Sequence, residues 1–251
     1  MPEKLTQIPK PKAASYKGGR KIYLVASMFG FQGVPDDLKS KLETYWTDVR
    51  SQIDNLEQSL AKITRVYHEG VFESGETGLE SVNNINSYAY PFINTLCKST
   101  AKLESLEDKV LVQEEYDWRI CSSAGLTSEK VYSLILKNLE ESTAKRWSHA
   151  STIIDSTIPK DEAALLIVNE NHKIQFPEDI QVFYVSPPSF DAVKRWVDNQ
   201  IKLMVEAQRK SSDVTENEPE KTSDKDKSDK GKESTNDNGG TDKDKPIDYP
   251  Y

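Results

Sequence analysis

The hydrophobic positions of the first two hundred residues follow two periodicities. Four short runs are rich in β-branched and aromatic residues and end at glycine, proline or polar clusters, which predicts β-strands at 21–27, 63–70, 162–169 and 179–188. The third run, EAALLIVN, is apolar without interruption, as a strand covered on both faces requires. Elsewhere apolar residues recur at steps of three and four, which predicts amphipathic helices.

The first helix is predicted over residues 36–60, because Pro35 and two acidic residues suit a helix N-terminus. Its apolar stripe consists of Leu38, Leu42, Tyr45, Trp46, Val49, Ile53, Leu56 and Leu60. We interpret the stripe as the face that packs on the core. The alternative is a coiled-coil surface for a partner, because the same steps fit heptads. The flanking strands complete a βαβ unit, and its turn, ASMFGFQG, lacks the full glycine spacing of a dinucleotide site.

A helical block without strands is predicted at about 76–158, with helical periodicity at 78–85, 90–126 and 128–158. Thr127 or Ser128 caps its last helix, and Pro159 ends it. A further helix follows Ser189.

The connection at 170–178 is too short for a crossover helix, so the last two strands are antiparallel neighbours or have another strand between them. The fold class is therefore α/β: a small, mostly parallel central sheet of about four strands with a large helical insertion.

The ends of the chain differ in composition from its middle. Residues 1–19 are rich in lysine, proline and glycine and are expected to be flexible, and residues 210–251 carry almost no apolar side chain, which predicts a disordered, acidic, charge-mixed tail. A single α/β domain at 20–209 remains.

The net charge of -8 and pI of about 5.1 argue against nucleic-acid binding. With no membrane-length apolar run and no signal peptide, we expect no membrane association and a cytoplasmic protein.

Polar side chains follow two of the predicted strands. His68 and Glu69 end the second strand, and His172 follows the third. If these strands are parallel, their carboxyl ends meet at one edge, where ligands bind in open α/β sheets. His172 and His68, together with the carboxylate of Glu69, are then candidate ligands of a divalent metal, since imidazole and carboxylate suit zinc. The alternative is that His172 is an ordinary hydrogen-bonded turn residue.

Arg146 on the long helix completes the candidate site. It could orient a small anionic ligand or a carboxylate near the strand ends, with Arg146 and Glu69 as the candidate catalytic residues; the alternative is a solvated arginine. Neither the HExxH nor the GxSxG motif occurs, so no reaction is identified by a motif.

The stretch RWSHASTIIDSTIPKDEAALLIVNENH (146–172), together with IYLVAS and RVYHEG, resembles the TraB and ChaN-like (erythromycin-esterase-like) superfamily. Residue by residue the resemblance covers Arg146, Glu69 and His172. It implies an α/β fold with a metal- or haem-associated edge and, in some members, hydrolase activity. The segment VASMFG lacks the histidine of the family's first strand end, and Asn169 stands where the family has glycine, so the resemblance is to a divergent member.

Residues 162–198 also resemble the last domain of archaeal and eukaryotic peptide-release factors, which implies a translation-linked binding module. No Gly-Gly-Gln tripeptide occurs, so this resemblance implies no peptidyl hydrolysis. Two functions follow from the sequence. The first is a metal-dependent hydrolase or a metal- or haem-binding protein. The alternative is a non-enzymatic interaction protein that binds a protein partner through its tail and the stripe on helix 36–60. The substrate and the oligomeric state stay open.

Overall fold

The computed structural model describes residues 18–31 and 33–215, with side chains as far as residue 206. The chain divides into two units, Met1–Met204 and Val205–Tyr251, and the sheet belongs to the first. In chain order the elements are β1 (Arg20–Ala26), α1 (Asp36–Ser59), β2 (Ile63–His68), α2 (Gly75–Ile85), α3 (Tyr90–Ser99), β3 (Lys102–Leu103), α4 (Lys109–Ser123), α5 (Glu129–Thr157), β4 (Ala163–Val168), β5 (Ile180–Val185) and α6 (Pro188–Thr215).

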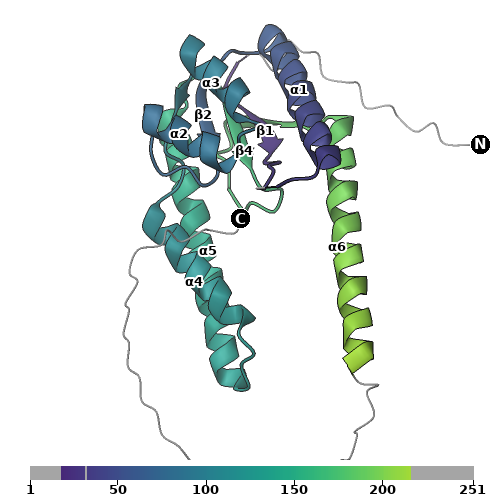
Figure 1. Ribbon diagram of the computed structural model, residues 1–251. Helices are drawn as coiled ribbons and strands as arrows, with labels where there is room; N and C mark the ends of the chain where they lie inside the picture. The colour runs from purple at the N-terminus through teal and green to yellow at the C-terminus, as the bar shows by residue number, and fades with distance from the viewer. Residues whose placement is uncertain (1–17, 32, 216–251) are drawn as a thin grey trace, which may run out of the picture. The chain divides into compact units, whose positions relative to one another are not determined.

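A five-stranded sheet lies at the centre, in the order β3-β2-β4-β1-β5 (Figure 1). Every neighbouring pair is parallel, which confirms the predicted α/β class. Strand β1 lies between β4 and β5 and is parallel to both. Residues 169–179 therefore cross back to the amino edge of the sheet as a segment without a helix, with Ile174 and Phe176 packed in the cluster on the α5 side. Of the two arrangements that the sequence allowed, the intervening strand is the one that forms.

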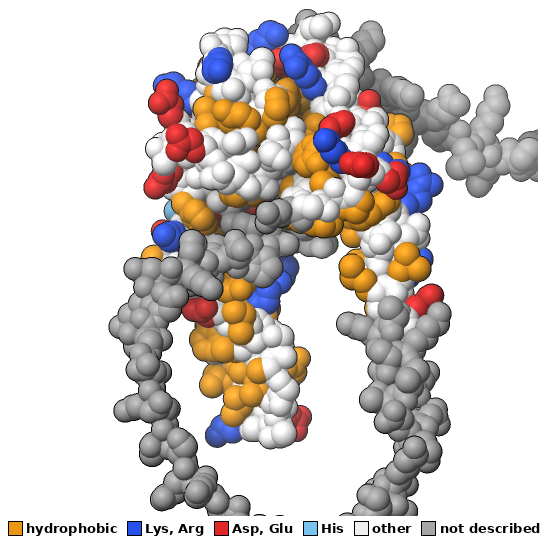
Figure 2. Space-filling model, viewed as in Figure 1, with side chains coloured by type: hydrophobic (Ala, Val, Ile, Leu, Met, Phe, Trp, Pro, Cys, Tyr) orange, Lys and Arg blue, Asp and Glu red, His pale blue; other side chains and the backbone are white. Residues whose placement is uncertain are grey.

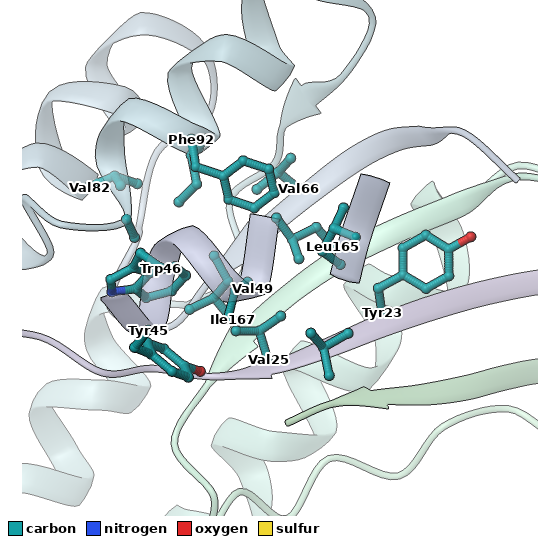
Figure 3. Close-up of a cluster of buried hydrophobic side chains, with 14 of the residues drawn as sticks. Tyr23, Val25, Tyr45, Trp46, Val49, Val66, Val82, Phe92, Leu165 and Ile167 are labelled. Atoms are coloured by element: carbon teal, nitrogen blue, oxygen red, sulfur yellow. The ribbon is translucent and has the colours of Figure 1, made fainter. Parts of the chain in front are cut away.

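One face of the sheet is covered by α1, α2, α3 and α6. Tyr45 and Trp46 of α1 pack with Val25 of β1 and Ile167 of β4, and Figure 3 shows these side chains in one cluster. Six residues of the α1 stripe are buried there: Leu38, Leu42, Tyr45, Trp46, Val49 and Ile53. The core-facing interpretation of the stripe is therefore confirmed, and the coiled-coil alternative has no exposed stripe to use.

The second half of α5 covers the opposite face. Trp147, Ala150 and Ile154 pack on side chains of β1 and β4 that point away from α1, such as Leu24 and Leu166. Because β4 contributes to both clusters, all six of its residues are buried, as its uninterrupted apolar run predicted.

The sequence-based elements differ from the structure in three places. The predicted strand-free block contains β3, an edge strand of two residues. The helical pattern at 90–126 is two helices, α3 and α4, because α3 ends at Ser99 and Asp108 caps a new helix. Helix α6 continues to Thr215, into the predicted tail at 210–251. The rest of that tail, residues 216–251, and residues 1–17 lie outside the described residues.

Candidate functional site

The strand ends meet as the sequence predicted. Strands β2 and β4 are parallel neighbours with His68 opposite Ile167. Beyond the strands, the Glu69 backbone N–H donates to the Ile167 carbonyl at 2.9 Å. The Glu69 carboxylate accepts a hydrogen bond from the backbone N–H of Asn169 at 2.6 Å. The residues after Tyr67 and after Val168 therefore lie side by side at the carboxyl edge of the sheet.

Arg146 reaches this edge from α5 and contacts three carboxylates. Its Nη2 donates to Glu69 Oε1 at 3.0 Å, its Nε to Glu107 Oε2 at 2.9 Å and its Nη1 to Glu115 Oε2 at 3.2 Å. A second hydrogen bond joins Nη2 to Glu107. The guanidinium also lies over the Trp147 ring, 4.5 Å from its centroid. We call Glu69, Glu107, Glu115 and Arg146 the strand-end cluster.

Separate segments supply the other two carboxylates. Glu107 follows the buried Leu106, and its backbone N–H donates to the Val71 carbonyl at 3.2 Å. Glu115 lies on the side of α4 that faces α5 and also pairs with Arg119 one turn later. The cluster therefore joins β2, the segment after β3, α4 and α5.

Burial is the largest single influence on the pKa values of Glu69 and Arg146, but it sets the direction of the shift only for Glu69. It raises the pKa of Glu69 above its ordinary value, although the hydrogen bond from Asn169 and the charge of Arg146 oppose the change. Burial lowers the pKa of Arg146, but the hydrogen bond to Glu107 and the charges of the three glutamates outweigh it, so that pKa lies above the ordinary value. The guanidinium stays charged and donates to protein carboxylates through all three nitrogens, so an anionic ligand would have to displace one of them.

The two histidines predicted as metal ligands lie on different faces of the sheet. His68 pairs with Ile167, so its side chain points to the α1 face, where Ile167 packs. There it is fully buried, with Nδ1 2.6 Å from the Glu69 carbonyl, and its Nε2 has no hydrogen-bond partner among the described residues. His172 lies on the α5 face, between the rings of Trp147 and Phe176. The structure does not bring these imidazoles together.

His172 has the contacts of a turn residue. Its Nδ1 accepts a hydrogen bond from the Ile174 backbone N–H at 3.3 Å, and partial burial lowers its pKa. Within residues 18–31 and 33–215, no group of three or more His, Cys, Asp and Glu side chains is arranged to hold a metal ion.

Sequence reasoning identified Arg146 and Glu69 but missed Glu107 and Glu115. Glu115 could have been identified from the sequence, because it is spaced by four residues from Leu111 and by three from Trp118 and so shares a helix face with them. A lone acid on an otherwise apolar face indicates a buried partner. Glu107 lies in a loop without periodicity, and no signal in the sequence marks it.

A second feature is the hairpin of α4 and α5, whose loop end, formed by the end of α4 and the start of α5, extends away from the sheet (Figure 1). Hydrophobic side chains gather over it in Figure 2. We call the following exposed residues the hairpin surface: Val110, Ile120, Leu126, Val131, Tyr132, Leu134 and Leu136. A smaller exposed stripe on α6 consists of Val197, Ile201 and Met204. In the described part of the chain no helix is both long enough and apolar enough to cross a membrane.

Comparison of the chain with models of known protein families, with characterised proteins and with solved structures gives no match. In the described part of the chain, the two features that point to a function are the strand-end cluster and the hairpin surface.

Proposed function

We propose that the protein is a non-enzymatic interaction protein that binds a protein partner through the hairpin surface. This proposal rests on the exposure of apolar side chains at the start of α5. Five of the six residues at 131–136 are apolar, yet only Ile135 is buried, while Val131, Tyr132, Leu134 and Leu136 are each more than 40% exposed. A helix that is apolar all round is ordinarily buried, and contiguous exposed apolar surface marks sites of association.

The strand-end cluster supports this function by holding the hairpin in place. Helix α5 packs on the sheet only through its second half, around Trp147, Ala150 and Ile154. Arg146 lies where the helix leaves the sheet, and its bonds to Glu69 and Glu115 connect the sheet edge to both helices of the hairpin. A preorganised surface loses less conformational entropy on binding than a mobile one.

The metal-dependent hydrolase predicted as the first alternative has less support. Both oxygens of Glu69 accept hydrogen bonds from within the protein, and Arg146 is engaged at every nitrogen. A cavity of about 630 Å³ exists, but α2, α3 and β3 line it, and none of the strand-end cluster does.

The experiment is site-specific photo-crosslinking of the full chain in cells. A photoreactive residue replaces Leu134 in one protein and Lys39, exposed on α1, in the control. We expect a discrete protein–protein product from position 134 only, and its loss when Val131→Glu is added. The proposal would be overturned if positions 134 and 39 gave the same crosslinked products. It would also be overturned if the product from position 134 still formed after Val131→Glu.

A further inference from the structure

We propose that the partner of the hairpin surface is the same surface on a second copy of this chain. This inference rests on the proposed function and specifies the partner. Two antiparallel helices with an apolar outer face are half of a four-helix bundle, and a second identical hairpin supplies the other half. A two-fold axis makes such a contact self-complementary, because each copy contributes the same residues.

The charges of the hairpin are suited to this partner. Residues 109–146 carry six Lys and Arg and six Asp and Glu, so the hairpin is neutral although the chain carries -8. Two hairpins can therefore approach without net repulsion. A nucleic acid or an anionic lipid surface would instead require an excess of lysine and arginine on the exposed face. Neutrality thus favours a protein partner of the same composition.

The distribution of charge along the hairpin also specifies the orientation. The part nearest the loop, residues 118–137, has three basic residues (Arg119, Lys130, Lys137) against Glu129. The part nearest the sheet, residues 109–117 and 138–146, has five acidic residues against three basic ones. In an antiparallel pair, the positive part of each hairpin lies against the negative part of the other.

This arrangement brings the apolar residues to the centre of the contact. With the two-fold axis near Leu134, the exposed apolar residues 131–136 of both copies meet around it. Lys130 is four residues before the axis, and Glu140 and Glu141 are six and seven residues after it. In the antiparallel pair Lys130 of one copy therefore lies within about 5 Å, measured along the helix, of the level of Glu140 and Glu141 of the other. The contact therefore has an apolar centre and a charged rim, which is the usual anatomy of a protein interface.

The test is the mass of the purified full chain by sedimentation equilibrium across micromolar concentrations. We expect twice the 28.4 kDa monomer mass. Leu134→Glu should weaken self-association by about 100-fold, because the buried charge occurs twice across a symmetric contact. The matched control is Ile201→Glu, an equally exposed apolar residue on α6, which should leave the dimer intact. Circular dichroism of each variant reports whether it is folded.

A charge exchange tests the orientation. Lys130→Glu should weaken the dimer, and adding Glu140→Lys and Glu141→Lys should restore it. The proposal is overturned if the wild type is a monomer at 100 μM, on the order of the weakest functional contacts, or if Ile201→Glu dissociates the dimer while Leu134→Glu does not. It is also overturned if the triple variant stays as weak as Lys130→Glu. A monomeric wild type whose position 134 still crosslinks to a different protein removes the second copy and leaves the proposed function standing.

Discussion

The carboxylate of Glu69 accepts a hydrogen bond from the backbone N–H of Asn169 at 2.6 Å, which joins the residue after β2 to the residue after β4. The other oxygen of Glu69 accepts from Arg146 on α5. The same carboxylate therefore fixes the spacing of two strand ends and the position of a helix across the sheet edge. Its neighbours Glu107 and Glu115 are almost completely buried, so the whole cluster depends on the charge of Arg146.

Replacing Arg146 with Met should destabilise the protein by about 3–5 kcal/mol, because two buried carboxylates and the partly buried Glu69 lose their shared cation. The free energy of unfolding from urea titrations measures this effect. The control is Lys145→Met on the preceding residue of α5, whose ammonium is exposed and 3.8 Å from Glu114. It should change stability by about 0.5 kcal/mol or less. Equal effects of the two substitutions would contradict a structural role for the cluster.

His68 should make stability fall as the pH decreases from about 6.5 to 4. Burial lowers the folded-state pKa of His68 to about 4, although the hydrogen bond to the Glu69 carbonyl acts in the opposite direction. Below pH 6.5 the unfolded chain therefore binds a proton that the folded chain does not. The loss approaches about 3 kcal/mol at pH 4. Urea unfolding at several pH values should show a weaker acid loss in His68→Gln. Parallel pH profiles for the two proteins would contradict the prediction.

The sequence predicted the sheet because its strands have strong local signals. The run AALLIV of β4 is buried at every residue, and β1 and β5 combine β-branched residues with glycine or proline boundaries. The edge strand β3 was missed because two residues, Lys102 and Leu103, cannot establish a period. It forms because it can pair with Arg65 and Val66 of β2, which is tertiary information.

The site was predictable only where it follows the strands. Glu69 could be placed at the edge because it comes directly after a strand. Arg146 could be placed there because it lies within the long helix, just before the apolar residues that cover the sheet. The two histidines were wrongly expected together, because alternation along β2 sends His68 to one face while the turn after β4 leaves His172 on the other. Sequence spacing alone does not determine the face that a residue in a turn will take.

The stripe of α1 should behave as core in a substitution experiment. Leu42 is fully buried between α1 and the sheet, so Leu42→Ala should cost about 2–5 kcal/mol through lost burial and a cavity. The control Lys39→Ala, on the exposed face of the same helix, should be nearly neutral. Thermal unfolding by circular dichroism compares the two, and a Leu42→Ala protein as stable as wild type would show that the stripe does not pack on the core.

Asp108 should stabilise α4 as its N-cap. Its Oδ1 accepts hydrogen bonds from the backbone N–H groups of Val110 at 2.8 Å and Leu111 at 3.0 Å. Asp108→Ala should therefore cost about 1 kcal/mol, whereas Asp108→Asn keeps an acceptor and should cost less. Ser128, the cap of α5, accepts one longer bond of 3.4 Å, so Ser128→Ala should have a smaller effect than Asp108→Ala. Urea unfolding of the three variants gives the order, and a reversed order would contradict the capping geometry.

Gly78 in α2 should not tolerate a side chain. A Cβ there would overlap the carbonyl oxygen of Glu73 and lie 2.9 Å from Leu103 Cδ2, next to the edge strand. Although alanine favours helices, Gly78→Ala should therefore destabilise the protein by about 1–3 kcal/mol. The matched control is Gly125→Ala in the loop between α4 and α5, where a Cβ meets no described atom within 4 Å and no loss is expected. A stabilised Gly78→Ala protein in urea unfolding would mean that α2 can move away from Glu73, and that its packing against β3 is loose.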